Sequence, residues 1–165
     1  MVNDTQVLNN GYPMPSIGLG VYKITDEDME NVVNTAIETG YRAFDTAYFY
    51  GNEVALGKAL QNSGVDREDL FITSKLWNDY QGYDNTIEYF NQSLENLGLD
   101  YIDLFLIHWP CEKDGLYIES YKALEKLYDE GKVKAIGVCN FKQHHLEKLM
   151  EETEVVPQVN QIELH

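Results

Sequence analysis

The chain alternates between short, nearly continuous apolar runs and longer segments whose apolar residues recur with helical spacing. In the first long segment, Met29, Val33, Ala36 and Ile37 share one face of a helix, and Gly40 follows as a stop signal. The apolar runs have the length of strands and are apolar almost throughout, as in strands buried on both faces. The pattern therefore predicts an α/β protein.

The predicted elements follow a regular order. The Asn-Gly pair at residues 10–11 predicts a hairpin at the N-terminus. Strands are expected over residues 16–22, 42–47, 70–77, 101–110, 134–141 and 158–164, and helices over residues 26–39 and 52–62 and around Ile87–Leu97, Tyr121–Tyr128 and Leu146–Met150. Such strand–helix repeats imply a parallel sheet with helical crossovers. A doubly wound sheet and a (β/α) barrel both fit this order.

Polar residues close five of the predicted strands at their C-terminal ends: Asp45, Lys75, His108, Asn140 and Gln161. In a parallel barrel these ends converge on one face, where barrel enzymes build their active sites. In an open sheet, strands on the two sides of the switch point would hold these residues too far apart to meet. The coincidence of five such ends favours the barrel.

Each of these residues also has a purely structural interpretation. Asp45 and Lys75 could form an ion pair that only stabilises the fold, and His108 could be a hydrogen-bonded core histidine. Asn140 could cap the following helix, and Tyr50 could serve packing, as most tyrosines do. Their occurrence together at the ends of successive strands favours a shared site.

The side chains at these ends suit proton transfer to a carbonyl oxygen. The ordinary pKa of tyrosine is about 10, and a nearby Lys75 ammonium would lower the pKa of Tyr50 toward the working range of a general acid. Asp45 would keep Lys75 charged, and His108 would donate a hydrogen bond to the substrate oxygen. The sequence shows no nucleophile–base pair for hydrolysis and no metal-ligand spacing. The reducing electrons would therefore come from a cofactor.

Composition narrows the possible partners. The chain has 165 residues, enough for one domain with a sizeable core, and a formal net charge of −16. This charge argues against a general nucleic-acid or anionic-membrane binder. No signal peptide precedes the first strand, and no apolar run approaches the roughly 20 residues of a membrane span. A cytoplasmic protein is expected, and Cys111 and Cys139 suggest no disulfide framework.

Several segments resemble the aldo-keto reductase family in order and spacing. "GYRAFDTAYFYGNEVALG" and "VKAIGVCNF" are similar to its two signatures, and "FITSKLW", "LIHWP" and "VNQIELH" resemble further family segments. The stretch "WNDYQGYDNT" looks most like bacterial glyoxal or methylglyoxal reductases. The resemblance implies a (β/α)₈ TIM barrel behind an N-terminal β-hairpin, NADPH as cofactor, and reduction of aldehydes and ketones.

The resemblance also implies a role for each matching residue. It makes Tyr50 the proton donor, Lys75 the group that lowers its pKa, Asp45 the partner of Lys75, and His108 the residue that orients the carbonyl. Gly20, Val21, Cys139, Asn140 and Gln161 would contact the cofactor, the last two through its carboxamide, and Tyr22, Trp77 and Trp109 would form apolar walls of the substrate pocket. No metal site is expected. Such walls suit a small carbonyl substrate such as methylglyoxal.

Two features depart from the family pattern. Cys139 replaces the serine that usually precedes Asn140, so one hydroxyl hydrogen bond would be lost. The chain ends at His165, just past the sixth predicted strand, although barrels of this kind typically need about 250 residues. We therefore expect residues 1–165 to form one incomplete domain, truncated after the sixth strand, whose open sheet edges favour self-association.

Two other functions stay open at this stage. The chain could be a catalytically silent partial barrel, because the family segment that grips the 2′-phosphate of NADPH would lie beyond the sixth strand. Alternatively, a lysine at a barrel strand end can form a Schiff base with a carbonyl substrate, as in lyases. Asp45 argues against a lyase, because it would keep the Lys75 amine protonated.

Overall fold

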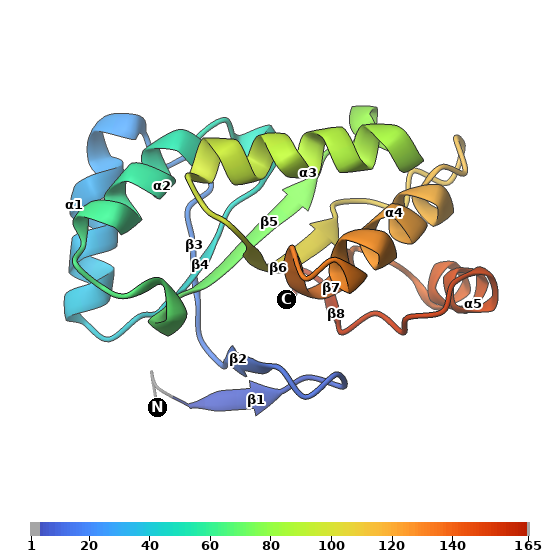
Figure 1. The fold of residues 1–165 in the computed structure, drawn as a ribbon, viewed down its shortest axis with the longest axis horizontal. Helices are drawn as coiled ribbons and strands as arrows, with labels where there is room; N and C mark the ends of the chain where they lie inside the picture. Colours follow the sequence, from blue (N-terminus) through green and yellow to red (C-terminus); the bar gives the residue numbers. More distant parts are fainter. Residues whose placement is uncertain (1–3, 165) are drawn as a thin grey trace.

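The computed structural model describes residues 4–164, and its centre is a six-stranded, all-parallel sheet (Figure 1). The strands lie in chain order: β3 (Leu19–Gly20), β4 (Ala43–Asp45), β5 (Phe71–Leu76), β6 (Ile102–Ile107), β7 (Val133–Cys139) and β8 (Val159–Gln161). Each consecutive pair is parallel, so every connection is a crossover. A doubly wound sheet reverses its strand order at a switch point. The unbroken order seen here instead forms a half-barrel.

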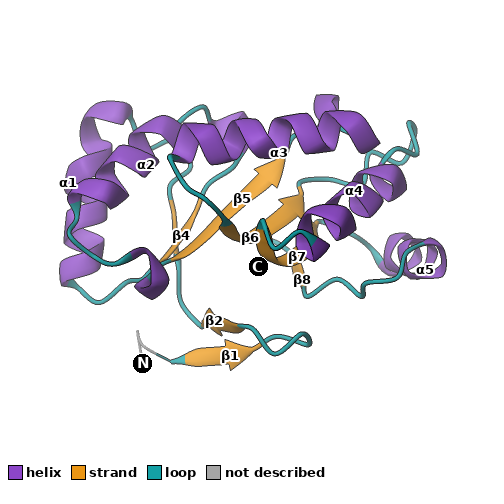
Figure 2. Cartoon of the chain, in the orientation of Figure 1, coloured by secondary structure: helices purple, strands orange, loops and turns teal. Residues whose placement is uncertain are grey.

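Helices cover one face of the sheet (Figure 2). They are α1 (Asp26–Glu38), α2 (Glu53–Asn62), α3 (Tyr83–Leu97), α4 (Tyr117–Asp129) and α5 (Gln143–Glu152), with the short 3₁₀ turns η1 (Tyr48–Tyr50), η2 (Arg67–Asp69) and η3 (Asn78–Tyr80) between them and the strands. In α1 the apolar face predicted from the spacing is buried, and the Thr25 hydroxyl accepts a hydrogen bond from the Asp28 amide as an N-cap. The α/β order of elements is confirmed.

Two apolar clusters hold the layers together. The larger lies between the sheet and the helices and includes Phe44, Phe90, Phe105 and Leu124. Within this layer α2 and α3 approach so closely at Gly57 that a Cβ there would lie 2.2 Å from the carbonyl oxygen of Leu97. The smaller cluster, Ala43, Phe71, Leu104, Leu106, Ala135 and Cys139, is joined by side chains of the N-terminal hairpin.

The predicted hairpin is confirmed as two antiparallel three-residue strands, β1 (Thr5–Val7) and β2 (Pro13–Pro15). Its turn contacts α4, since the Asn10 side-chain nitrogen donates to the Tyr128 hydroxyl at 3.3 Å. Its Tyr12 hydroxyl donates to Asp103 Oδ1 at 2.7 Å, and Asp103 also accepts from Arg67 Nη2 at 2.6 Å and from the Ile72 amide at 2.8 Å. Because Asp103 is almost fully buried, this cluster of bonds anchors the hairpin to β5 and β6.

The strand bounds are narrower than predicted at the margins of the sheet. The strand expected over residues 16–22 is only Leu19–Gly20, and the one expected over residues 158–164 is only Val159–Gln161. These are the two edge strands, which find a partner on one side alone among the described residues. Beyond the paired positions, Tyr22 and Ile162 turn toward solvent. One-sided pairing is not the whole cause, because β4 pairs on both sides and is also shorter than the strand expected over residues 42–47.

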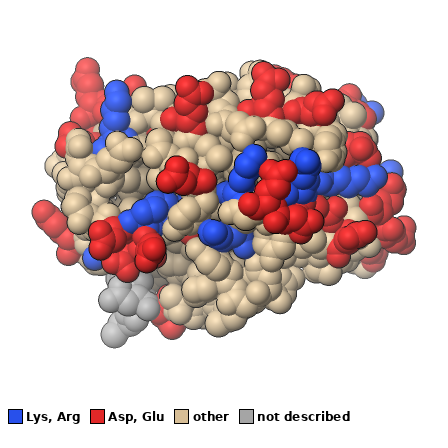
Figure 3. Space-filling view, viewed as in Figure 1, with Lys and Arg blue, Asp and Glu red and all other residues tan. Residues whose placement is uncertain are grey.

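Charged side chains are distributed over the surface (Figure 3). Acidic residues lie at many separate places on the face shown, and basic residues lie beside several of them. Several of these neighbours form exposed ion pairs on or near α4, such as Lys122–Glu119 and Lys126–Glu130. Among residues 4–164, no helix is both long and apolar enough to cross a membrane.

Candidate active site

The structure brings the four predicted proton-transfer residues to one end of the sheet. Asp45 is the last residue of β4, Lys75 lies in β5, and His108 directly follows β6. Tyr50 ends η1, the turn that follows β4. Because the strands are parallel and in chain order, these positions share the C-terminal edge of the half-barrel.

Lys75 is the buried centre of this group, with 1% of its side chain exposed. Its Nζ donates to Asp45 Oδ1 and to the Thr46 carbonyl oxygen, the latter at 2.8 Å. The same Nζ lies 5.2 Å from the centroid of the Tyr50 ring. An unpaired buried ammonium would be very costly, so the carboxylate stabilises the charge. The predicted Asp45–Lys75 ion pair is confirmed, and it faces Tyr50.

The acidity of Tyr50 differs from the sequence-based expectation. Burial raises the pKa of the Tyr50 phenol, and this effect outweighs the lowering caused by the Lys75 ammonium, while Asp45 raises the pKa further. Lys75 thus acts in the expected direction, but the predicted net lowering is wrong. The phenol is therefore protonated at neutral pH, as an ordinary tyrosine also is, and the Lys75 ammonium limits how weak an acid it becomes.

His108 is held as a neutral imidazole. Burial, followed by the nearby Lys75 charge, lowers the pKa of His108 to about 4. Its ring meets the Tyr50 ring edge-on, with centroids 5.9 Å apart, and the Trp77 ring at 5.2 Å. Its Nδ1 is buried and has no hydrogen-bond partner among the described residues. A neutral imidazole N–H can orient a carbonyl oxygen without adding a charge to the site.

Aromatic side chains surround the Tyr50–His108 pair. Tyr22 packs against Tyr50 with ring centroids 4.7 Å apart, and Trp77 stacks on Phe49 at 3.8 Å. Tyr22 and Trp109 are about half exposed, so both rings can be reached from solvent. Phe49 was not singled out by the sequence. Its place next to Tyr50 in the 3₁₀ turn, and opposite Trp77, adds it to this wall.

The residues expected to contact a cofactor lie around the same strand ends. The Gln161 amide nitrogen donates to Asp45 Oδ2 at 2.8 Å, and the Asn140 amide nitrogen donates to the His108 carbonyl oxygen at 3.1 Å. Gly20 is exposed, and a Cβ at this position would meet nothing within 4 Å. Two carboxamide-bearing side chains and an unobstructed backbone fit a nicotinamide and its adjoining ribose.

The structure excludes the capping role considered for Asn140 and also shows that the neighbouring Cys139 is not a reactive thiol. Asn140 does not cap α5, because Lys142 occupies the N-cap position and the Asn140 backbone, with φ of 60°, turns its side chain toward His108. Cys139 is a buried thiol whose pKa burial raises to about 12, so it is no nucleophile. It lies 3.9 Å from the Gln161 amide oxygen.

A cluster of potential metal ligands that the sequence analysis did not find lies beside the site. Glu112, His144 and His145 place ligand atoms within 4.8 Å of one another. However, the Lys142 amide donates to His145 Nδ1 at 3.1 Å, so the neutral ring carries its proton on Nε2, the nitrogen nearest Glu112. That nitrogen cannot bind a metal while the Lys142 bond is intact. The His145 ring therefore serves the start of α5, where it accepts from the Lys142 amide.

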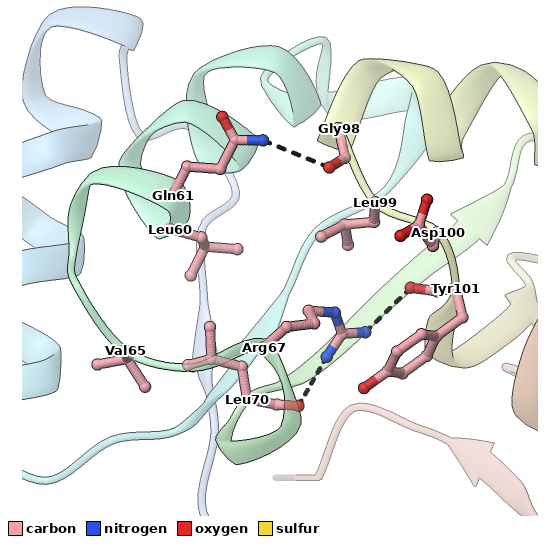
Figure 4. Close-up of a pocket in the computed structure, with 9 residues that line it drawn as sticks. All are labelled: Leu60, Gln61, Val65, Arg67, Leu70, Gly98, Leu99, Asp100 and Tyr101. Carbon is pink, nitrogen blue, oxygen red and sulfur yellow. Dashed lines mark hydrogen bonds between the residues drawn. The ribbon is translucent and has the colours of Figure 1, made fainter.

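A separate pocket of about 260 Å³ lies away from these residues, between the segments that follow α2 and α3 (Figure 4). The Arg67 guanidinium at its wall donates to the carbonyl oxygens of Leu70 and Tyr101 and pairs with Asp103. Arg67 is thus committed to holding the chain together. The pocket contains none of the predicted site residues.

The sequence of residues 16–165 matches the Aldo/keto reductase family. The chain is 52% identical to the glyoxal reductase of Bacillus subtilis over 165 residues, covering 99% of this chain and 59% of that protein. It is 49% identical to methylglyoxal reductase DkgA of Escherichia coli O157:H7, covering 100% of this chain and 60% of that protein. The chain thus spans about three-fifths of the length of these relatives.

Solved structures show the same fold. The crystal structure of an aldo/keto reductase from Brucella melitensis superposes with a TM-score of 0.95 at 48% identity, over 98% of this chain and 63% of that one. A structure of a Gox0644 mutant in complex with NADPH superposes with a TM-score of 0.93 at 45% identity, over 100% of this chain and 59% of that one. These similarities agree with the order of the strands and with the geometry at their C-terminal ends. The chain therefore belongs to the aldo/keto reductase family.

Proposed function

We propose that this chain carries the proton-transfer centre of an NADPH-dependent carbonyl reductase. The observation that supports it best is the contact of a protonated phenol, Tyr50, with the buried Lys75–Asp45 pair on one side and the neutral His108 ring on the other. A hydrolase would need a nucleophile with an adjacent base. A phenol beside a buried cation instead suits protonation of an oxygen that gains negative charge.

In the proposed reaction the substrate carbonyl oxygen binds between the Tyr50 hydroxyl and the His108 ring. NADPH, when bound, supplies the hydride that adds to the carbonyl carbon. Tyr50 gives its phenolic proton to the oxygen, so hydride and proton together yield the alcohol. The Lys75 ammonium then stabilises the phenolate that remains, because it is buried and held by Asp45 at a fixed place. Bulk water returns the proton to Tyr50.

The cofactor is proposed to lie along the strand ends where Asn140 and Gln161 carry their amide groups. Both amides now donate to neighbouring residues, His108 and Asp45, so each would exchange or share that bond with the nicotinamide carboxamide. Gly20 would border the ribose, since nothing obstructs the space beside it, whereas the expected contact of Val21 is not favoured because Val21 is fully buried. A Gox0644 structure that resembles this chain contains NADPH, which supports the choice of cofactor.

Small aldehydes and dicarbonyl compounds are the proposed substrates. The walls formed by Tyr22, Trp77 and Trp109, together with Phe49, are aromatic and partly exposed. They suit a compact, flat carbonyl compound. Relatives about half identical to this chain are a glyoxal reductase and a methylglyoxal reductase. Methylglyoxal is therefore the first substrate to test.

We further propose that the half-barrel is one incomplete (β/α)₈ domain. The relatives are longer than this chain, which supports two further strand–helix units in the complete protein. A Schiff-base lyase is not favoured, because the Lys75 nitrogen already donates to both Asp45 and Thr46 as a buried ammonium.

The proposal is tested by following the near-ultraviolet absorbance of NADPH with methylglyoxal as substrate. Turnover should disappear in Tyr50→Phe and persist in Tyr41→Phe, a matched change at the opposite end of β4. Equal rates in the two variants would exclude Tyr50 as the donor. If folded protein binds NADPH but does not turn over, the silent partial barrel becomes the better description. Borohydride trapping of substrate on Lys75 would instead support the lyase.

A further inference from the structure

Two buried polar residues that have no assigned role connect opposite sides of the candidate site. Thr46 and Asn52 are 0% and 3% exposed. The Thr46 hydroxyl donates to Asn52 Oδ1 at 2.8 Å, and Asn52 Nδ2 donates to the Val21 carbonyl oxygen at 2.8 Å. The Thr46 carbonyl oxygen accepts from Lys75 Nζ at 2.8 Å. A continuous path therefore joins Val21, on the cofactor side, to Lys75, on the proton-transfer side.

The same bond closes the turn that presents Tyr50. Thr46 precedes η1 and Asn52 follows it, so their contact joins the two ends of the segment with Tyr50 between them. Within the segment, the Tyr50 amide donates to the Ala47 carbonyl oxygen at 2.9 Å, and Gly51 takes the left-handed φ of 70° that reverses the chain. The position of the phenol is thus determined by the closure of this turn.

Both ends of the path are fixed independently. The Val21 amide donates to the Asp45 carbonyl oxygen at 2.9 Å, so Asn52 completes the bonding of a fully buried Val21. At the start of α2, the buried Glu53 accepts from the Ser74 hydroxyl at 2.6 Å, and Ser74 directly precedes Lys75 in β5. The turn is therefore tied to the cofactor strand through Asn52 and to the lysine strand through Glu53.

We propose that Thr46 and Asn52 are positioning residues, which hold the Tyr50–Lys75 pair in register with the backbone of Val21. This inference rests on the proposed reductase function, in which the phenol and the cofactor must act on one carbonyl group. Hydride and proton reach adjacent atoms of that group, so a small shift of the turn separates the donors. Misplacement of reacting groups by about 1 Å can cost about a hundredfold in rate.

The test uses the protein at its full natural length. Thr46→Val removes the hydroxyl and keeps the shape and the carbonyl oxygen that Lys75 needs, and Asn52→Leu removes both amide bonds. Thr86→Val is the matched control, because Thr86 is equally buried and its hydroxyl donates to the carbonyl oxygen of Gly82, the N-cap of α3, at 2.6 Å. Thr46→Ser restores the hydroxyl and should recover the wild-type rate.

We expect Thr46→Val to lower kcat by about tenfold with little change in the NADPH Kd, because only the phenol turn is released. Asn52→Leu should lower kcat to a similar degree and raise the NADPH Kd about fivefold, because it also removes one of the two hydrogen bonds to the Val21 carbonyl oxygen and leaves only that from the Ile24 amide. The double variant should match Asn52→Leu within about twofold, since both bonds belong to one path. If the two residues only stabilised the fold, Thr46→Val and Asn52→Leu would not differ in their effect on the NADPH Kd. The effects of the two changes on kcat would also not saturate in the double variant.

Two results would overturn the inference. The first is a kcat of Thr46→Val equal to that of Thr86→Val, and the second is a fold-loss in kcat of the double variant equal to the product of the two single fold-losses. If the wild-type protein neither binds NADPH nor turns over, the proposed function fails, and the path is then tested by hydrogen exchange. The Ile24 amide donates to the Val21 carbonyl oxygen at 3.1 Å, so it should exchange faster in Asn52→Leu than in Thr86→Val. Equal exchange would exclude the connection itself.

Discussion

Replacing Tyr12 with phenylalanine tests how the N-terminal hairpin is held against the sheet. The change removes the bond from the Tyr12 hydroxyl to Asp103 and leaves the Arg67 and Ile72 bonds to the same carboxylate. A hydrogen bond to a charged group contributes about 1.5–3 kcal/mol. Tyr12 is only half-buried, and its ring would keep its contact with Phe71. We therefore expect the free energy of unfolding to fall by about 1.5 kcal/mol.

The pH dependence of this loss provides a second check. Burial, followed by the hydrogen bond to Asp103, raises the pKa of Tyr12. A raised pKa in the folded state means that the phenol stabilises the fold fully below the unfolded value of about 10, and that this contribution is lost as the pH rises above it. The difference between wild type and Tyr12→Phe should therefore shrink at alkaline pH.

Urea unfolding followed by circular dichroism, at neutral pH and at about pH 11, measures both effects. Tyr83→Phe is the control, because Tyr83 is an exposed tyrosine of α3. The reasoning would be refuted by a difference below about 0.5 kcal/mol at neutral pH. It would also be refuted by a difference that stays constant as the pH rises.

Three further changes address the site and the fold. Lys75→Met removes the buried ammonium beside Tyr50, and we expect kcat for methylglyoxal to fall by at least about a hundredfold, whereas an unchanged rate would contradict its role. Gly57→Ala places a Cβ 2.2 Å from the Leu97 carbonyl oxygen and should lower the unfolding free energy by about 1–3 kcal/mol, with Gly20→Ala as the control in open space. Because β3 and β8 each pair on one side only within residues 4–164, we also expect concentration-dependent self-association on sizing, and a monomer at every concentration would argue against it.

The main features of the site follow from rules that act along the sequence. A lysine inside an apolar strand must find an opposite charge, so the Asp45–Lys75 pair could be predicted and is confirmed. The convergence of strand ends follows from parallel order alone. These rules depend on residue type and strand direction, which the sequence contains.

Other features depend on how deeply a side chain is buried and on the backbone conformation, and neither can be read from the sequence pattern. The pKa of Tyr50 is decided by how deeply its turn is buried, and burial outweighs the effect of Lys75. The direction of the Asn140 side chain follows from a left-handed backbone at a non-glycine residue. The bond between Thr46 and Asn52 forms between ordinary loop residues and has no spacing signature.

The residues of the candidate site come partly from the central strands of the sheet and partly from its two edge strands. Lys75 lies in β5 and His108 directly follows β6, and both strands have neighbours on both sides, whereas Gly20 and Gln161 belong to the edge strands β3 and β8. Edge strands lie at the low-stability end of a fold and open before its centre. On warming, the proposed dinucleotide site should therefore loosen while the Lys75–His108 side of the site remains assembled, so cofactor affinity and the geometry for proton transfer should have separate melting temperatures.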